Sequence, residues 1–312
     1  MVQKMNKKLI KISTNSRIHM GFFSHDIKNP YSYGGIGLCI NKYPTVVSIT
    51  PVSQFSSNLS KNYQDKIIRF LDIHKLSKKI HIKLVSSPDR HIGLGSGTQL
   101  ILSIEESLMR YFNLSSWPNI YNRNYRSGIG YNTYKHGGFI IDSPKRSNTE
   151  NQIIFKHKFP KDWNIILLFD YSIRGANGKI EKEFFLNNKV MHLREKLSDI
   201  TLNEIIPSIL YQDYETFTLA LTKFQYMNSK FYSSIQKSPF ISKDVHTIIK
   251  KLSDKYKFGY GQSSWGPTSY IITKSNNHLN KILSVLDNLI SMYNNLAYNV
   301  VSAKNSGRKL IQ

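Results

Sequence analysis

The stretch His91-Ile92-Gly93-Leu94-Gly95-Ser96-Gly97-Thr98-Gln99 decides the fold, because it stands directly before a segment of helical periodicity. Apolar side chains recur in that segment at helical spacing: Leu100, Ile101, Ile104, Leu108 and Tyr111. They predict a helix over 99–111 with one buried face. A glycine-rich turn at a helix N-terminus presents backbone amides and hydroxyl groups that attract anions. We therefore predict that Gly93, Gly95, Ser96, Gly97 and Thr98 bind phosphate.

This glycine loop differs from the common nucleotide-binding fingerprints. It lacks the six-residue glycine spacing of dinucleotide-binding proteins, and it lacks the Gly-Lys-Ser/Thr ending of a Walker loop. The alternative interpretation is a glycine-rich turn with a helix N-cap, which needs no ligand. Three glycines and two hydroxyls before a helix favour phosphate binding over that alternative.

Outward from the loop, strand and helix patterns predict an α+β protein. Strand patterns occur at 9–13, 36–40, 45–49, 80–85, 138–142, 152–157, 163–169, 269–273 and 297–302. Helical patterns occur at 202–211, 213–230, 243–256 and 277–293, and Gly259-Tyr260-Gly261 ends the third of them. We predict two lobes, 1–160 and 161–312, that meet near Pro160 with a site between them.

The charge balance is strongly basic. Lysine and arginine number 43 and aspartate and glutamate 20, so the net charge is +23. The basic residues are scattered, however, with only short groups such as Lys7-Lys8 and Lys78-Lys79, whereas a nucleic-acid footprint needs clustering. We expect no nucleic-acid binding, and we expect the excess charge to attract anionic small molecules.

The single cysteine and the apolar runs bear on location. Cys39 has no cysteine partner, so the chain forms no internal disulfide and we expect a reducing, cytoplasmic compartment. The residues after the N-terminal lysines do not form a secretory signal. The apolar run Ile165-Ile166-Leu167-Leu168-Phe169 has the length of a buried strand, and we expect no membrane association.

Three further segments carry candidate binding residues. Arginine beside glycine in Arg123-Asn124-Tyr125-Arg126-Ser127-Gly128-Ile129-Gly130 suits bidentate binding of phosphate or carboxylate, although a solvated basic loop explains it equally well. Trp265 stands among small polar residues in Gly261-Gln262-Ser263-Ser264-Trp265-Gly266-Pro267-Thr268, where it could stack on an aromatic ring. Arg17-Ile18-His19 precedes the glycine group Gly34-Gly35-Ile36-Gly37, and taken alone it is as consistent with a structural role.

Together these segments resemble the β-ribofuranosylaminobenzene 5′-phosphate synthase family, a branch of the GHMP kinase superfamily. The resemblance spans most of the chain, and the Gln262 to Thr268 run is its most specific part. It implies a two-lobed fold with an N-terminal α/β lobe and a ferredoxin-like C-terminal lobe. Kinases of the superfamily carry a carboxylate after the Ser-Gly pair, whereas Gly130 follows Ser127-Gly128-Ile129 here. The family also usually reads Arg-Gly where this chain has Arg123-Asn124.

The resemblance implies a decarboxylating condensation of 5-phosphoribosyl 1-pyrophosphate with 4-aminobenzoate or 4-hydroxybenzoate, at the entry to methanopterin synthesis. It implies Mg²⁺ on the phosphate oxygens and the possibility of a homodimer. We assign the glycine loop to one phosphate group and Arg126 with Ser127 to the other. Arg17 and His19 would hold the benzoate carboxylate. Trp265, with Gln262, Ser263 and Ser264 around it, would form the wall for the ring.

Metal ligands and two alternative functions stay open at this point. Asp26, Glu106, Asp142 and Glu181 are carboxylates that could reach a metal, although exposed surface carboxylates are commoner than ligands. The first alternative is an ATP-dependent small-molecule kinase of the same superfamily, which Gly130 opposes. The second is a nucleic-acid-binding protein, which only the net charge of +23 supports.

Overall fold

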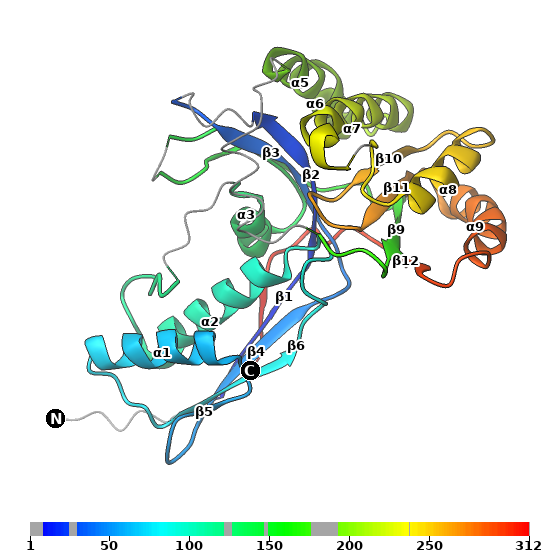
Figure 1. Cartoon of the computed structure of the whole chain (residues 1–312). Coiled ribbons are helices and arrows are strands. Elements are labelled where there is room, and N and C mark those ends of the chain that lie inside the picture. The colour runs from blue at the N-terminus through cyan, green and yellow to red at the C-terminus, as the bar shows by residue number, and fades with distance from the viewer. Residues whose placement is uncertain are drawn as a thin grey trace.

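Helix α2 (Ser96–Phe112) follows the glycines Gly93 and Gly95 and begins three residues before the predicted start at 99, so Ser96, Gly97 and Thr98 of the predicted loop form its first turn. The computed structural model describes residues 9–24, 30–121, 127–146, 149–175, 193–236 and 238–311. The first sheet has the order β13-β1-β4-β6-β5 and consists of β1 (Ile10–Thr14), β4 (Thr45–Pro51), β5 (Ser56–Ser57), β6 (Ile80–Ser86) and β13 (Lys309–Ile311). Helices α1 (Lys61–Ile73) and α2 cover one face of it (Figure 1).

The second sheet carries the residues that approach the glycine loop. Its order is β2-β3-β7-β8, with β2 (Arg17–Ser24), β3 (Tyr33–Cys39), β7 (Phe139–Asp142) and β8 (Ile153–His157). Helix α3 (Ile129–His136) packs between this sheet and α2. A β-carbon on Gly130 in α3 would lie 2.9 Å from Thr98 Cγ2, so only glycine allows this approach of the two helices.

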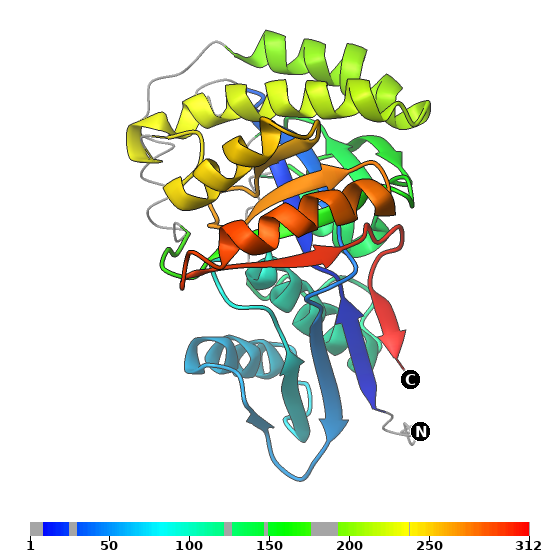
Figure 2. The ribbon, with the colours of Figure 1, turned by 90° about the vertical axis from the view of Figure 1, so that its right-hand side faces the viewer.

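The third sheet and six helical segments form the described C-terminal part. The sheet order is β10-β11-β9-β12, with β9 (Asn164–Asp170), β10 (Gly259–Gln262), β11 (Ser269–Thr273) and β12 (Leu296–Val301). Helices α8 (Lys243–Ser253) and α9 (Asn276–Ile290) pack on one face through a shared apolar core (Figure 2). The other segments are α5 (Arg194–Ile200), the π-helical turn η1 (Thr201–Ile205), α6 (Ile206–Leu210) and α7 (Tyr214–Gln236).

One hydrophobic core joins the second and third sheets. It includes Ile18 and Phe139 from the second sheet, Ile165 and Tyr270 from the third, and Phe217 from α7 between them. The last strand, β13, returns to pair antiparallel with β1, and Figure 2 shows the two strands side by side. The predicted division into two lobes at residue 160 stays a prediction. Strand β13, from the predicted second lobe, lies in the first sheet beside β1.

The strands and helices predicted from periodicity are largely confirmed, with two corrections. The helix predicted at 243–256 ends at Ser253, and the glycines that follow form strand β10 rather than a helix terminus. The helix predicted at 202–211 is the second part of a longer helical stretch that begins at Arg194. Helices α1 and α3 and strands β2 and β13 were not predicted. Among the described residues, no helix is long and apolar enough to cross a membrane.

Candidate active site

The glycine loop has a backbone conformation that its glycines make possible. Gly93 and Gly95 have φ angles of +87° and +80°, in the left-handed region that favours glycine, and Gly95 is the N-cap of α2. A β-carbon on Gly97 would meet nothing within 4 Å, so this side of the helix start is open. Within the described chain, no hydrogen bond occupies the Ser96 and Gly97 amides. The loop therefore presents backbone donors to an open space, as an anion site requires.

Residues from distant parts of the chain hold the loop in place. Arg17 Nη1 and Ser263 Oγ each donate a hydrogen bond of 2.7 Å to the Gly93 carbonyl, and Thr268 Oγ1 donates one of 2.5 Å to the Ile92 carbonyl. Gly266 lies against the loop so closely that a β-carbon on it would stand 2.3 Å from the Gly93 Cα. The segment 262–268 and β2 thus fix the loop from two sides.

His19 connects β2 to the start of α3. Its ring is 2% exposed; its Nδ1 accepts from the Gly21 amide at 3.2 Å, and its Nε2 lies 3.2 Å from Ser127 Oγ. Because Nδ1 is an acceptor, the neutral ring carries its proton on Nε2 and donates it to Ser127. Ser127 Oγ also accepts from the Ile129 amide at 3.1 Å, which places the hydroxyl at the N-terminus of α3.

Asp142 continues this chain of contacts at the end of β7. Its Oδ2 lies 3.4 Å from Ser127 Oγ and accepts from the Gly128 amide at 2.5 Å, while Oδ1 accepts from the Gly35 amide at 2.6 Å. Burial raises the pKa of Asp142 to about 7, and the hydrogen bonds from Gly35, Gly128 and Ser127 limit the rise. A carboxyl group with a pKa this close to neutrality, beside a serine and a histidine, is typical of a functional site.

The segment 262–268 touches both the loop and His19. Ser263 Oγ accepts from the His19 amide at 3.0 Å as it donates to Gly93, and the Ser264 amide donates to the His19 carbonyl at 3.0 Å. Gln262 Oε1 accepts from the Ile241 amide at 2.7 Å and its Nε2 donates to the Ser264 carbonyl at 2.9 Å. The three polar residues predicted to surround the ring therefore form the frame that joins the segment 262–268 to the glycine loop and to β2.

Curated proteins similar to this chain share one name. This chain is 28% identical over 293 residues to the β-ribofuranosylphenol 5′-phosphate synthase of Methanothermobacter thermautotrophicus. The alignment covers 84% of this chain and 88% of that protein. For the synthase of Methanocaldococcus jannaschii the identity is 26% over an alignment of 338 residues, 93% of this chain and 99% of that protein. The chain is a distant relative of these synthases. No family model matches it.

Solved structures agree with the predicted fold. Homoserine kinase from Cytophaga hutchinsonii superposes with a TM-score of 0.69 at 14% identity, over 100% of this chain and 99% of that one. Mevalonate diphosphate decarboxylase from Staphylococcus aureus superposes with a TM-score of 0.67 at 15% identity, over 98% of each chain. The fold is the α+β fold of the GHMP kinases, and at these identities the likeness concerns the fold alone.

Two residues that the synthase resemblance placed on the aromatic substrate have other contacts in the structure. Arg17 donates to the Gly93 carbonyl and packs 3.1 Å from where a Gly95 β-carbon would stand, so it supports the loop. Trp265 is 5% exposed and packs with Phe22 and Tyr232, at 4.6 Å between the Trp265 and Tyr232 ring centroids. Its role as a wall for the substrate ring stays a prediction. Of the residues assigned to phosphate, Arg126 lies outside the described residues, and the Ser96 hydroxyl donates to the Asp89 carbonyl at 3.3 Å.

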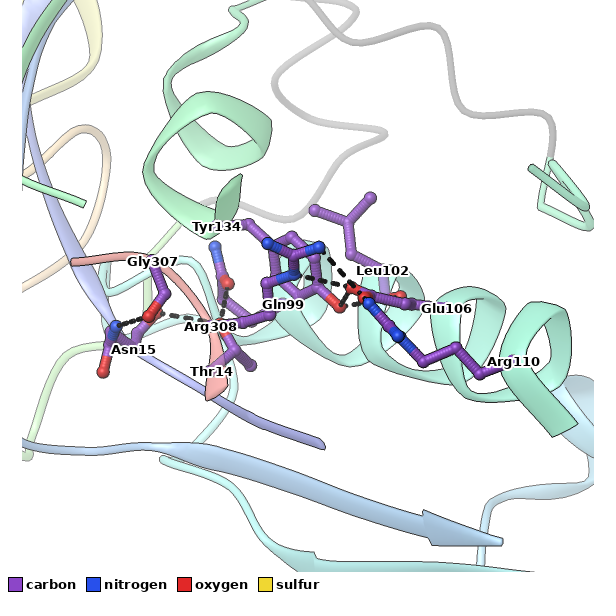
Figure 3. A network of polar contacts seen from close by, with 9 residues as sticks. All are labelled: Thr14, Asn15, Gln99, Leu102, Glu106, Arg110, Tyr134, Gly307 and Arg308. Carbon is purple, nitrogen blue, oxygen red and sulfur yellow. Dashed lines mark hydrogen bonds and ion pairs between the residues drawn. The ribbon is translucent and has the colours of Figure 1, made fainter. Parts of the chain in front are cut away.

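Glu106, one of the candidate metal ligands, belongs to a structural network instead. Its carboxylate accepts from Tyr134 Oη at 2.6 Å, from Arg308 Nε at 2.9 Å and from Arg110 Nη2 at 2.7 Å (Figure 3). Burial alone would raise the pKa of Glu106, but these hydrogen bonds outweigh it and the pKa is lowered. With its oxygens occupied, Glu106 is a cross-link of α2, α3 and the strand β13 rather than a metal ligand.

The other metal candidates give no ligand cluster in the part of the chain that can be described. Asp142 accepts two backbone amides and Ser127, and Asp26 and Glu181 lie outside the described residues. Among the residues with a described position, no three His, Cys, Asp or Glu side chains come together as metal ligands. Asp142 is nevertheless a site residue whose role the sequence did not reveal, because its partners Gly35 and Ser127 are distant in the chain.

Proposed function

We propose that the protein is a decarboxylating phosphoribosyl transferase, a β-ribofuranosylaminobenzene 5′-phosphate synthase or its phenol counterpart. It would condense 5-phosphoribosyl 1-pyrophosphate with 4-hydroxybenzoate or 4-aminobenzoate and release CO₂ and pyrophosphate, the first step of methanopterin synthesis. The relationship to the named synthases over most of the chain supports this reaction class. The observation that carries it is the open glycine loop held by the 262–268 segment beside Ser127.

The same geometry favours a transferase over a kinase. A superfamily kinase uses a carboxylate near the position of Gly130 to activate its acceptor hydroxyl. Gly130 has no side chain, and the contact with Thr98 leaves no room for one. A condensation that attacks through a ring carbon has no acceptor hydroxyl to deprotonate, so it does not need that carboxylate.

The reaction balances without a net proton transfer. The bond from ribose C1 to the pyrophosphate oxygen breaks and its electron pair leaves with pyrophosphate. The ring carbon that carries the carboxylate supplies a π pair to C1, and the ring–carboxylate bond then breaks, which restores the aromatic ring and releases CO₂. The electron-donating 4-substituent stabilises the cationic ring intermediate between these two steps.

Two groups of residues would perform the positioning and the electrostatic work. The Ser96 and Gly97 amides, which no hydrogen bond occupies within the described chain, would bind phosphate oxygens and stabilise the charge that grows on the leaving group. The Ser127 hydroxyl, half-buried and held by His19 and Ile129, would turn its proton from Asp142 Oδ2, 3.4 Å away, to a second substrate oxygen. Mg²⁺ belongs to the proposal as a charge-neutralising partner of the diphosphate oxygens. The described residues offer it no ligand cluster, and no step depends on it here.

Release of labelled CO₂ tests the proposal. Carboxyl-labelled 4-hydroxybenzoate and 4-aminobenzoate are incubated with the protein and Mg²⁺, with and without phosphoribosyl pyrophosphate. We expect label release that depends on the donor, and roughly ten- to a hundredfold lower kcat for Ser127→Ala because one hydrogen-bond donor in the site is lost. Ser284→Ala on the exposed face of α9 is the matched control. Absence of label release, together with ATP-dependent phosphorylation of either acid, would contradict the transferase proposal and show a kinase instead.

A further inference from the structure

A cavity of about 340 Å³ lies in the C-terminal part, between α7, α8 and the edge strand β10. Figure 1 shows these three elements next to one another. Its volume is within the range of about 300 to 1,000 Å³ that small-molecule sites occupy. It is separate from the glycine loop, because none of the loop residues is among those that line it.

The cavity has aromatic walls. Phe240 stacks with His246, with the ring centroids 5.3 Å apart and the planes at 25°, and with Tyr260 at 6.1 Å and 29°. Tyr226 and Ile249 complete the apolar lining. Rings in this arrangement favour a flat aromatic ligand, which can stack on them or meet them edge to face.

The two amide side chains that line the cavity, Gln225 and Gln262, are already bonded within the protein. Gln225 Oε1 accepts from the Gln262 amide at 3.1 Å, and Gln225 Nε2 donates to the Met20 carbonyl. The Gln262 side chain bonds to Ile241 and to Ser264. A nucleobase or a sugar would need free donors and acceptors at depth, so the interior favours a ring without polar groups there.

The mouth of the cavity carries a cation. Lys250, exposed on α8, is one of the lining residues, and no acidic side chain is among the described residues that line the cavity. A phosphate group typically needs several donors, whereas one ammonium group matches one carboxylate. We propose that this cavity is a second binding site, for a small planar aromatic carboxylate whose ring packs against Tyr226, Phe240 and Tyr260 and whose carboxylate meets Lys250.

The cavity also borders the catalytic frame. Gln225 and Gln262 line both this cavity and a smaller one of about 20 Å³ that reaches Gly21 and Ser264. A ligand in the larger cavity therefore contacts Gln225, which connects β10 to β2, and Gln262, which bonds to the Ser264 carbonyl beside His19. The side-chain amide signals of Gln225 and Gln262 therefore report whether a ligand binds in this cavity. The binding itself does not depend on the proposed reaction.

A titration with 4-fluorobenzoate, followed by ¹⁹F NMR and by the side-chain amide signals of Gln225 and Gln262, tests the proposal. We expect saturable binding that moves both amide signals. Thr222→Phe on α7, which fills the cavity from its side wall, should weaken the affinity about tenfold or more. Lys250→Met should weaken it several-fold, whereas the neighbouring Lys251→Met, exposed and outside the cavity, should leave it unchanged.

Three results would overturn the proposal. The first is no saturable binding to the wild-type protein. The second is equal affinity in wild type, Thr222→Phe and Lys250→Met. The third is binding that pyrophosphate abolishes and Thr222→Phe does not, because the acid would then occupy only the glycine-loop site. All three readouts are independent of turnover, so they stand whether or not CO₂ release is observed.

Discussion

Gly95 and Gly97 are two positions apart, and the structure gives them opposite tolerance for a side chain. Gly95 has a φ of +80°, and a β-carbon on it would lie 3.1 Å from Arg17 Cζ, whereas Gly97 faces open space. We expect Gly95→Ala to lose about 1–2 kcal/mol of unfolding free energy. Gly97→Ala should keep wild-type stability within about 1 kcal/mol. Chemical denaturation measures both.

The Gly97→Ala variant also tests the anion site. A methyl group on Gly97 would stand beside the open amides of the loop, so Gly97→Ala should bind pyrophosphate more weakly than wild type although it is folded. Isothermal titration calorimetry measures this. Unchanged pyrophosphate affinity in Gly97→Ala would contradict a phosphate site at the start of α2.

The raised pKa of Asp142 predicts how the stability of the folded protein depends on pH. Burial raises this pKa from the ordinary value of 3.8 to about 7 in the folded protein. The folded state therefore holds a proton that the unfolded state has lost, and the stability from this group, present below pH 4, disappears as the pH rises to about 7. We expect wild type to lose stability relative to Asp142→Asn over this window, by up to about 1.4 kcal/mol per pH unit. A stability difference that does not change with pH would contradict the raised pKa.

At the scale of elements, the network around Glu106 joins α2, α3 and β13. Arg308, the residue directly before β13, donates two hydrogen bonds to the Glu106 carboxylate, and Tyr134 on α3 donates to the same group. Arg308→Met should lower the unfolding free energy by about 1–3 kcal/mol, because a buried carboxylate loses two hydrogen bonds. The exposed Lys309→Met on β13 is the control. Equal stability of the two variants would show that Arg110 and Tyr134 suffice for Glu106.

The elements that periodicity predicted are those with a continuous apolar signal. β9 and β11 are buried along almost their whole length, and α2 and α9 each present one apolar face. β10 escaped prediction because two of its four residues are glycines, which are typical of turns. α1 escaped because only Ile67, Phe70 and Leu71 of its thirteen residues are buried.

The candidate site could be predicted only in part, for a related reason. The glycine loop is local, so its residues and its helix are visible in one stretch of sequence. The contacts of His19 with Ser127, of Ser127 with Asp142 and of Ser263 with Gly93 join residues from five separate segments. A sequence pattern gives no sign of such pairings. The setting of Trp265 among small polar residues indicated stacking on a substrate ring, and in the structure Trp265 packs with Phe22 and Tyr232 of the protein itself.

At the scale of the whole molecule, the second and third sheets share one core around Phe139, Phe217 and Tyr270, and the final strand β13 returns to β1. The glycine loop and the 262–268 segment, far apart in the sequence, are bonded to each other through Gly93 and Ser263. A substrate held by both would thus be fixed against a frame to which both segments contribute, which is the positioning that a carbon–carbon bond-forming reaction needs.

The central claim is that the protein joins ribose C1 to the ring carbon that loses its carboxylate. The most direct measurement uses phosphoribosyl pyrophosphate labelled with ¹³C at C1 and 4-hydroxybenzoate labelled with ¹³C at the ring carbon that carries the carboxylate. We predict a product whose two labelled carbons show one-bond ¹³C–¹³C coupling by NMR. A product in which C1 is bonded to oxygen, with the carboxylate retained, would contradict the account, as would an unaltered donor in the presence of acid and Mg²⁺.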